Sequence, residues 1–427
     1  MIKKQKTILF VMPRLPYPAL SGRKTSLYHY CRILSEELGY RLVVAAFLES
    51  GDDPSNMPNF IDRLIVLDKT SVVSKFMTIL KASVFLKKWP MQVSLFWSKN
   101  AKKTIDNIIE EEKPDIVIGD MVRSTEYIKN VKVYRIADLD DRISLRYQRQ
   151  LNTDLKGINP YGAFLGSVPK LIQRIMLFNP IKKLVVKNEI NLLRRYELQI
   201  GKICEKTIFV AKEEVKQFNK ELGINKAIAV PIGVDIDFFS YRKTGLSGNY
   251  IGFLGAMNVA HNDNAVRHFV LNILPHILKK QPDVKFLVIG GGVTDDLKKL
   301  SSNHVEFVGR VDDVRVYLQN CKVFVCPMKF GSGIKTKILE AMSLGLPVVT
   351  TTIGAENIDA INGKDWIIAD EDDSFAEAVI SLINDDKKRE SMGQSGSHFI
   401  KNNFTWDIAR EQFIKLFADM SDTTKLI

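Results

Sequence analysis

The sequence has few cysteines, and their spacing indicates neither disulfide bonds nor a metal site. The four of them lie far apart in 427 residues, without a CxxC pair, at Cys31, Cys204, Cys321 and Cys326. Zinc sites and disulfide frameworks both need cysteines at short or regular spacings, so neither kind of structure is indicated. We therefore expect the protein to work in a reducing compartment such as the cytosol.

Long apolar runs are also missing. No run approaches the roughly 18 apolar residues that would span a bilayer. The first residues, MIKKQKTILFVMPRL, contain only about six apolar residues before Pro13, which is shorter than the core of a signal peptide. This start predicts a buried first strand, and we expect a cytoplasmic protein that is at most peripheral to the inner face of a membrane.

Acidic residues are missing from one long stretch of the first half. Between Asp68 and Asp106 there are eight lysines and no acid, interleaved with large apolar side chains such as those of Trp89 and Trp97. Residues 1–235 carry 39 basic against 25 acidic residues, whereas the rest of the chain carries 22 against 24. Basic residues mixed with aromatic ones suit an anionic membrane surface. A solvated basic face is the alternative, and nucleic acid is not the expected partner, because the apolar content exceeds what a groove that follows phosphates needs.

A strand, a glycine-rich turn, a helix and a second strand follow one another in residues 323–356, VFVCPMKFGSGIKTKILEAMSLGLPVVTTTIGAE. The β-branched run VFVCP predicts the first strand, and Gly331, Ser332 and Gly333 allow a tight turn with free backbone amides. Anions bind favourably where a helix starts after such a turn. Gly345 then ends the helix, and LPVVTTT is typical of a buried parallel strand.

Two lysines and a glutamate lie in the first turns of this helix. Lys335 and Lys337 place positive charge where a phosphate would bind, and Glu340 shares a helix face with Lys337. A carboxylate at this position accepts hydrogen bonds from vicinal hydroxyls such as those of a ribose. The alternative is a surface ion pair worth about half a kcal/mol beside a turn of a common kind. The residues alone leave both interpretations open.

The string GSGIKTKILEAMSLGLPVVTT resembles the nucleotide-sugar site of the GT-B glycosyltransferases, in particular the retaining family-4 and related group 1 transferases. The resemblance implies a nucleotide diphosphate sugar as donor, retention of anomeric configuration, no cofactor and no obligatory metal. Lysine charge and helix-start amides must then stabilise the leaving diphosphate. The residues expected to bind the donor are Gly255, Gly309, Arg310, Gly331, Ser332, Gly333, Ile334, Lys335, Lys337 and Glu340.

This chain departs from the family pattern at two places. In relatives, the glycine that corresponds to Gly255 is commonly followed by an arginine and then a lysine that face the pyrophosphate, but no basic residue appears here before Arg267. We therefore expect Lys335 or Lys337 to replace that clamp. Relatives also often have a second glutamate eight positions before the one that corresponds to Glu340. Serine stands there in this chain, which leaves the identity of the sugar open.

Acidic residues follow two strands of the first half. Asp120 ends the strand DIVIGD, and Asp138, Asp140 and Asp141 follow in VKVYRIADLDD, at the edge where open α/β sheets contact ligands. Such carboxylates orient an acceptor hydroxyl or take its proton, or else they cap the next helix. Many relatives carry a histidine in this domain, whereas this chain has none between positions 29 and 261. The acids therefore become the better candidates.

The loop after the first strand resembles the family's first βα loop, whose small residues let the acceptor and the donor phosphates approach backbone amides. We assign Gly22, Arg23 and Asp141 to the acceptor side. The candidates for catalysis are the two lysines of the glycine-rich turn and three acids of the first half, Lys337, Lys335, Asp120, Asp138 and Asp140.

The order of the elements predicts an α/β protein with Rossmann-like domains, and the chain length predicts two of them. The resemblance implies the GT-B fold, with a cleft between the two domains. The predicted domains are an acceptor-binding domain over 1–235, a linker over 236–248 and a nucleotide-sugar-binding domain over 249–406. The C-terminal helix, 407–427, resembles the family's final helix, which packs back on the first domain.

We expect a hexosyltransferase-type glycosyltransferase that acts on a membrane-associated acceptor, lipid-linked or a cell-surface glycan, in polysaccharide biosynthesis of the cell envelope. Docking on an anionic membrane is expected through 70–103 and the basic region near 170–195. One alternative is a nucleotide-sugar epimerase on the same fold. The other is a catalytically silent nucleotide-sugar-binding scaffold protein, which the missing clamp and the missing glutamate favour.

Overall fold

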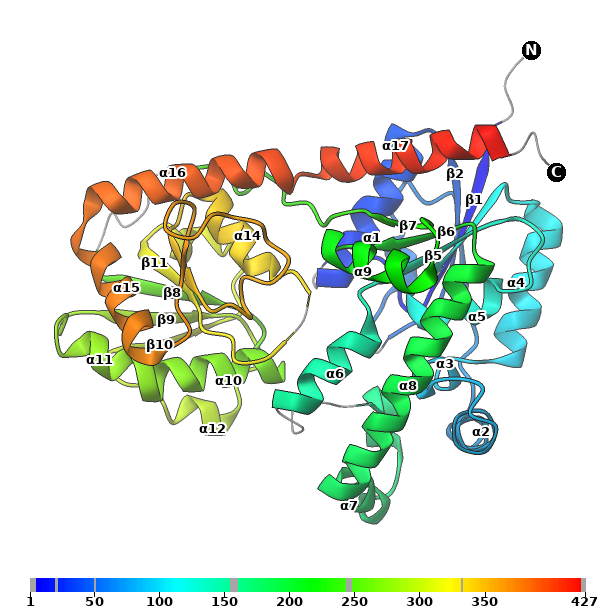
Figure 1. Ribbon diagram of the computed structural model, residues 1–427, viewed down its shortest axis with the longest axis horizontal. Helices are drawn as coiled ribbons and strands as arrows, with labels where there is room; N and C mark the ends of the chain where they lie inside the picture. Colours follow the sequence, from blue (N-terminus) through cyan, green and yellow to red (C-terminus); the bar gives the residue numbers. More distant parts are fainter. Residues whose placement is uncertain are drawn as a thin grey trace. The chain divides into compact units, whose positions relative to one another are not determined.

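The computed structural model describes residues 5–19, 22–49, 51–153, 160–242, 248–331 and 333–423. Its contacts divide the chain into two compact units, which are described separately here (Figure 1). The first unit comprises Met1–Pro231 together with Ala409–Ile427, and the second comprises Ile232–Ile408. No helix in the described part of the chain combines the length and the apolarity that crossing a bilayer requires.

The first unit is built on a seven-stranded parallel sheet in the order β3-β2-β1-β4-β5-β6-β7. Each strand is an apolar run, as buried parallel strands require. The order reverses between β1 and β4, which is the point where open α/β sheets bind ligands. The strands are β1 (Thr7–Met12), β2 (Arg41–Ala46), β3 (Arg63–Val66), β4 (Ile116–Asp120), β5 (Tyr134–Asp140), β6 (Lys206–Phe209) and β7 (Ala227–Ala229).

Helices connect these strands, and several of them form a separate helical layer after β3 and after β5. The connections near the sheet are α1 (Gly22–Arg32), η1 (Ile33–Glu37), η2 (Pro54–Asn56), α4 (Lys99–Glu112), α5 (Met121–Ile128) and α9 (Lys212–Leu222). The helical layer consists of α2 (Val72–Thr78), η3 (Ile79–Phe85), α3 (Met91–Ser94), α6 (Ile143–Thr153), η4 (Gly162–Ser167), α7 (Lys170–Leu177) and α8 (Asn179–Ile203). The basic apolar stretches of the sequence are therefore helical.

The second unit contains a six-stranded parallel sheet in the order β10-β9-β8-β11-β12-β13, which reverses between β8 and β11. Figure 1 shows α14 and α16 above this sheet and α10 and α11 below it. The strands are β8 (Tyr250–Leu254), β9 (Lys285–Ile289), β10 (Val305–Gly309), β11 (Cys321–Cys326), β12 (Val348–Thr350) and β13 (Ile367–Ile368). The helices are α10 (Ala260–His268), η5 (Phe269–Ile273), α11 (Leu274–Leu278), α12 (Asp295–Lys298), α13 (Arg315–Leu318), α14 (Thr336–Ser343), α15 (Asp372–Asn384) and α16 (Asp386–Asn403).

The last helix, α17 (Trp406–Thr423), joins the first unit from Ala409 onwards. Phe413 packs edge to face against Tyr30 of α1, with the ring centroids 5.1 Å apart, and Phe417 contacts Tyr40 at 5.1 Å. Such aromatic pairs add to the apolar area that the helix buries. These contacts place the described part of the predicted C-terminal helix against the first sheet's own helices.

The segment predicted as a linker differs from that prediction in the part that the structure describes. The two units separate between Pro231 and Ile232, before the predicted start of the linker at residue 236. Residues 236–242 are then anchored to the second unit: the Phe239 carbonyl accepts a hydrogen bond from Ser343 Oγ at 2.8 Å. Glycine and serine later in the segment favoured a linker, but Phe239 before them packs on the core of the second unit.

Candidate functional site

The glycine-rich turn of the second unit lies between β11 and α14. Gly331 and Gly333 adopt positive φ angles of 136° and 70°, which side-chain-bearing residues rarely adopt. These backbone conformations favour glycine at both positions, as the sequence predicts. Ser332 lies outside the described residues. Thr351 Oγ1 donates a 2.7 Å hydrogen bond to the Met328 carbonyl and so ties the start of the loop to the end of β12.

Three glycines at the carboxyl ends of neighbouring strands bring backbone close to this turn. The Gly255 amide donates to the Ile289 carbonyl at 2.9 Å, and the Gly290 amide donates to the Gly309 carbonyl at 2.8 Å. A Cβ on Gly290 would come within 2.0 Å of the Gly255 carbonyl oxygen, so no side chain fits there. The strand ends after β8, β9 and β10 therefore form a surface of bare backbone.

Lys337 lies directly against that backbone. A Cβ on Gly255 would come within 2.8 Å of Lys337 Nζ. The ammonium donates a hydrogen bond to Asn262 Oδ1 and lies 4.6 Å from the centre of the Phe253 ring. Burial lowers the pKa of Lys337 to about 8. The cation is thus held by an amide and an aromatic face, and a phosphate would relieve its desolvation.

Glu340 lies one helical turn further along α14 and is half-buried. Burial raises the pKa of its carboxyl to about 7, and the nearby Lys337 charge opposes this shift. Among the described residues no hydrogen-bond donor contacts the Glu340 carboxylate oxygens. These oxygens are therefore available to hydroxyl groups of a ligand, and ionisation of Glu340 becomes easier when such donors bind.

Other predicted donor residues lie in different surroundings. Lys335 is 6% exposed and donates from Nζ to the Gly333 carbonyl at 2.7 Å, so it holds the turn to which it belongs. Ile334 packs against the hydrophobic core of the second unit. Arg310 is exposed. The nearby carboxylate of Asp313 pairs with Arg315, at 2.7 Å.

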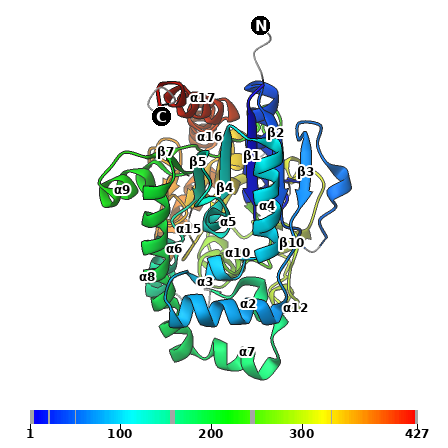
Figure 2. The ribbon, with the colours of Figure 1, turned by 90° about the vertical axis from the view of Figure 1, so that its right-hand side faces the viewer.

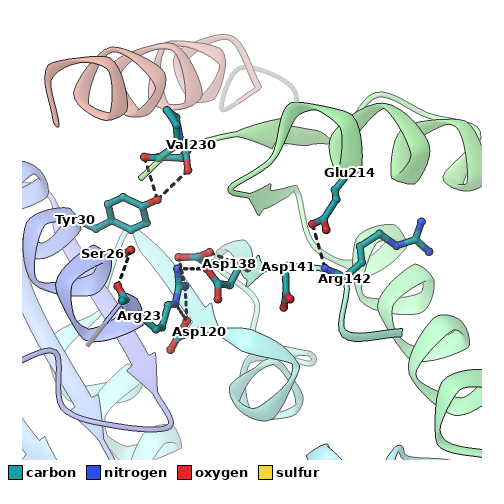
Figure 3. A network of polar contacts seen from close by, with 12 residues as sticks. Arg23, Ser26, Tyr30, Asp120, Asp138, Asp141, Arg142, Glu214 and Val230 are labelled. Atoms are coloured by element: carbon teal, nitrogen blue, oxygen red, sulfur yellow. Dashed lines mark hydrogen bonds and ion pairs between the residues drawn. The ribbon is translucent and has the colours of Figure 1, made fainter. Parts of the chain in front are cut away.

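In the first unit, Arg23 gathers three of the predicted acids around one guanidinium (Figure 3). Arg23 Nε donates to Asp120 Oδ1 at 3.0 Å, and Nη2 contacts the same oxygen. Nη2 also lies 2.7 Å from Asp138 Oδ2, and Nη1 donates to Asp140 Oδ1 at 3.0 Å. The side chain of Arg23 is only 8% exposed. Arg23, predicted on the acceptor side, thus links the ends of β4 and β5 to α1.

This cluster contains one arginine and three carboxyl groups, so its positive charge does not balance three ionised acids. Burial therefore raises the pKa values of the buried acids. Burial raises the pKa of Asp120, although Arg23 opposes the shift, and it raises the pKa of Asp138 to about 7. Asp120 is fully buried and Asp138 is 1% exposed. Both carboxylates therefore serve to balance the charge of Arg23 within the core.

Asp140 and Asp141 differ from these two acids. The side chain of Asp140 is 21% exposed, and its backbone has a φ of 65°, a left-handed conformation that aspartate adopts only at a cost. Asp141 pairs with Arg146 of α6 at 2.9 Å. Asp140 is therefore the acid of this cluster that a hydroxyl of an acceptor can reach.

Gly22 begins α1 next to this cluster. A Cβ built on Gly22 meets no atom within 4 Å, so the space beside it is open. Its φ is not left-handed, and an alanine would fit in the fold. The position is therefore compatible with close approach of a ligand, and any need for glycine there would come from that ligand.

Sequence reasoning missed Asn262 and three arginines. Asn262, on α10, is 5% exposed and positions Lys337, but a single asparagine in a polar helix start carries no visible signal. Arg123 follows β4 and donates to Gln92 Oε1 at 3.0 Å. The pKa of Arg123 is lowered to about 10 by burial and then by the nearby charges of Arg14 and Arg146. Arginines shortly after strand ends were the available signal. Of the three, Arg14 lies 3.7 Å from Glu49 and Arg146 lies 2.9 Å from Asp141.

Comparisons with known proteins show similarity to glycosyltransferases. A family model described as glycosyl transferases group 1 matches residues 248–385, from the start of the second sheet to the end of α15. An uncharacterized 44.6 kDa protein in the cps region of Klebsiella pneumoniae is 22% identical over 424 residues, which cover 96% of this chain and 99% of that protein.

Two further similarities concern a named enzyme and a solved structure. A phosphatidyl-myo-inositol mannosyltransferase of Mycolicibacterium smegmatis is 25% identical over 245 residues, which cover 54% of this chain and 60% of that protein. A crystal structure of a TarM variant from S. aureus, in complex with UDP and other ligands, superposes with a TM-score of 0.66. The identity is 13%, with 96% of this chain and 99% of that chain covered, so this likeness concerns the fold.

Proposed function

Because this chain belongs to the group 1 glycosyltransferases and has their GT-B fold, we propose that it moves a sugar from a nucleotide diphosphate sugar to a membrane-associated, phosphate-bearing acceptor. The single observation that carries the proposal is the pairing of Lys337 and Glu340 on α14. The first is a desolvated cation against bare backbone, and the second is a carboxylate whose oxygens have no hydrogen-bond donor among the described residues.

The donor fits this pair by its chemistry. The diphosphate takes the Lys337 ammonium together with the amides at the start of α14, and the ribose hydroxyls donate to Glu340. Lys337 thereby replaces the basic clamp that this chain lacks after Gly255, since its Nζ occupies the space beside that glycine. The relative of known fold from S. aureus holds UDP, which supports a nucleotide as ligand.

Transfer breaks the bond between the anomeric carbon and the diphosphate oxygen and forms a bond to an acceptor hydroxyl oxygen. Charge grows on the departing diphosphate, where Lys337 and the helix-start amides stabilise it more strongly than in the ground state. A protein that supplies this charge itself needs no obligatory metal. The acceptor hydroxyl gives up its proton in the same reaction, and we assign Asp140, the partly exposed acid of the first unit, to accept that proton. Retention of configuration is proposed on the family resemblance.

The acceptor side is assigned to the first unit by its charge. Arg14, Arg123 and Arg146 lie near one another at the carboxyl edge of the first sheet, where a phosphate would offset their repulsion. The relative from Mycolicibacterium smegmatis acts, by its name, on a phosphatidyl lipid. A lipid-linked acceptor and a location on the inner face of a membrane follow as proposals, with an anionic membrane surface as partner and a role in building cell-envelope polysaccharide.

The experiment is a screen of nucleotide sugars by thermal shift, followed by binding and transfer measurements with the donor that stabilises the protein. A matching donor near saturation should stabilise by more than about 2 kcal/mol. Glu340→Gln should weaken its binding by about 1–3 kcal/mol. The matched control is the same donor without ribose hydroxyls, whose affinity should be low for both proteins and should not differ between them. If Glu340→Gln weakened the binding of both donors equally, Glu340 would not contact the ribose hydroxyls.

Two other results would redirect the proposal. Conversion of the donor sugar without any acceptor would indicate a nucleotide-sugar epimerase on this fold. Donor binding without turnover on any phosphate-bearing acceptor would indicate a silent nucleotide-sugar-binding scaffold protein. Transfer that survives Lys337→Met unchanged would leave the donor site in place but assign the stabilisation of the diphosphate to other groups.

A further inference from the structure

The helical layer of the first unit contains an apolar groove of about 670 Å³. One wall is α2 with η3, and the other is α7 with the start of α8. Figure 2 shows α2 and α7 one above the other, with α8 passing near one end of both. The lining is aliphatic and aromatic along nearly its whole length, from residues that include Phe76, Ile79, Phe164, Ile172, Ile175 and Leu184.

The apolar surface continues outside the groove. Phe85 and Leu171, which do not line the groove, are 76% and 70% exposed on the same two helical walls. Exposed apolar patches of this extent mark interaction sites rather than ordinary surface. The described residues therefore leave both the groove and its rim to be covered by something outside this chain.

The charge around the groove is of one sign. Residues 69–105 hold eight lysines and no acid, and residues 155–188 hold six basic residues and no acid. Glu189, which lines the groove, is 1% exposed and accepts hydrogen bonds from the Met91 and Gln92 amides at 2.7 and 3.0 Å. It is therefore occupied with holding α3 to α8. The surroundings select a partner that carries negative charge.

Lys87 brings a cation to the groove itself. Of the described lining residues, it alone is cationic. It follows the end of η3 with a φ of 47°, and its carbonyl accepts a 2.8 Å hydrogen bond from Arg195 Nη2 of α8. Lys87 adopts this left-handed backbone conformation at the helix end, although glycine would adopt it at a lower conformational free energy. A polar headgroup at this end of the groove would meet the Lys87 ammonium.

We propose that this groove binds one hydrocarbon chain of an anionic membrane lipid, with the phosphate of that lipid at Lys87. A hydrocarbon chain has no polar groups, so an apolar lining leaves nothing unpaired. A peptide would bring backbone amides and carbonyls that this lining does not satisfy. A second copy of the chain would bring the same positive charge to the same face. This inference rests on the proposed function, for which a lipid site would hold the enzyme at its acceptor.

The first test uses the full chain and one soluble single-chain lipid, lysophosphatidylglycerol, below its micelle concentration and without vesicles. Calorimetry or native mass spectrometry should show saturable binding of one lipid per protein. Ile172→Trp adds volume inside the groove and should weaken this binding at least tenfold. The matched control is Leu171→Trp, the next residue on α7, which adds the same area outside the groove and should change binding less than twofold.

The second test concerns the headgroup. Lys87→Met should weaken binding of lysophosphatidylglycerol at least threefold and leave binding of neutral monopalmitoylglycerol unchanged. Lys88→Met is the control, because Lys88 does not line the groove and its ammonium lies 5.3 Å from the Trp89 ring. If Lys87→Met and Lys88→Met weakened binding of lysophosphatidylglycerol equally, the lipid phosphate would not bind at Lys87. Unfolding temperatures of all four variants should match that of the parent protein.

Three results would overturn the inference. Equal loss of binding in Ile172→Trp and Leu171→Trp would mean adhesion to a surface rather than a site. Absence of lipid binding together with a concentration-dependent dimer would make the groove an interface between copies. Absence of lipid binding in a protein that transfers sugar normally would leave the proposed function intact without this site. Conversely, lipid binding in a protein that transfers no sugar would confirm the groove and count against the proposed function.

Discussion

The two units carry the same kind of sheet but assemble their polar groups in different ways. In the second unit, the lysine, the glutamate and the glycines that meet at α14 belong mostly to one continuous stretch of chain. In the first unit, Arg23 meets Asp120 and Asp140 across 97 and 117 positions of sequence. In the second unit the carboxylate oxygens of Glu340 have no hydrogen-bond donor among the described residues, whereas in the first unit Arg23 and its three acids contact one another. A site that can be read from sequence is therefore one whose parts are local.

The largest expected effect is on stability, and it distinguishes a buried arginine of the first unit from an exposed arginine of the second. Arg23→Met leaves Asp120 and Asp138 buried without their cation, and this should cost about 3–5 kcal/mol of unfolding free energy at neutral pH. The cost should shrink toward pH 5, because the remaining acids then become protonated. Arg310→Met, which removes an exposed arginine from the second unit, should change stability by less than about 0.5 kcal/mol. Chemical denaturation measures both, and equal effects would contradict the difference between the units.

The next effect concerns turnover. Lys337→Met should lower kcat about a hundredfold or more, because the departing diphosphate loses its cation, and should weaken donor binding much less. Since the pKa of Lys337 in the ligand-free protein is about 8, kcat/KM of the parent enzyme for the donor should also fall as pH rises through that value. Lys329→Met, on the same loop but 40% exposed, is the control and should keep its activity. Steady-state kinetics over pH 6–9 would show whether the cation is at Lys337.

A third effect is a gain of stability in the donor-binding unit. Between about pH 4.5 and 7 the folded protein holds a proton on Glu340 that the unfolded chain has released, so this group lowers stability as pH rises. Glu340→Gln removes the penalty and should stabilise by about 1–3 kcal/mol above pH 7, and by nothing below about pH 4.5. Glu306→Gln, at an exposed position of β10, should stay neutral throughout. Thermal unfolding across pH measures the difference in stability between Glu340→Gln and the parent protein. A difference that did not change with pH would show that the raised pKa of Glu340 is not its cause.

A fourth effect tests whether one acid of the first unit still serves the reaction. Asp140→Asn keeps the shape of the partly exposed side chain and should lower turnover at least tenfold, about 1.4 kcal/mol, with donor affinity unchanged. Asp120→Asn should instead act mainly on stability, because Asp120 is fully buried against Arg23. If Asp140→Asn turned over normally while the fold was intact, carboxylates of this unit would have no part in the chemistry.

The smallest effects compare a glycine of each unit. Gly255→Ala places a Cβ at 2.8 Å from Lys337 Nζ, which must shift, so donor affinity should fall by about 1 kcal/mol. Gly22→Ala meets nothing within 4 Å and should leave stability within about 0.5 kcal/mol. A loss of acceptor affinity in Gly22→Ala without a loss of stability would show that a ligand approaches this backbone. No change in either measurement would remove Gly22 from the acceptor side.

The sequence by itself determined the fold class and the glycine-rich turn before α14. Apolar runs and glycines specify parallel strands, tight turns and a helix start through interactions between near neighbours, and residues 323–356 hold all of these in order. The same local logic placed Asp120 and Asp138 at strand ends and identified two basic apolar stretches. Sequence composition did not indicate that the predicted linker begins in contact with the second unit, because it does not show what Phe239 packs against.

Tertiary structure decided which of these residues meet. Pairing of β1 with β4 and of β4 with β5 brings Arg23 to its acids, and Asn262 reaches Lys337 only because α10 and α14 follow adjacent strands. The groove likewise exists only where α2 and η3 face α7, nearly a hundred positions away. Long-range contacts depend on how the sheet orders its strands, and burial, which sets the pKa values of Asp138 and Glu340, is a property of that packing.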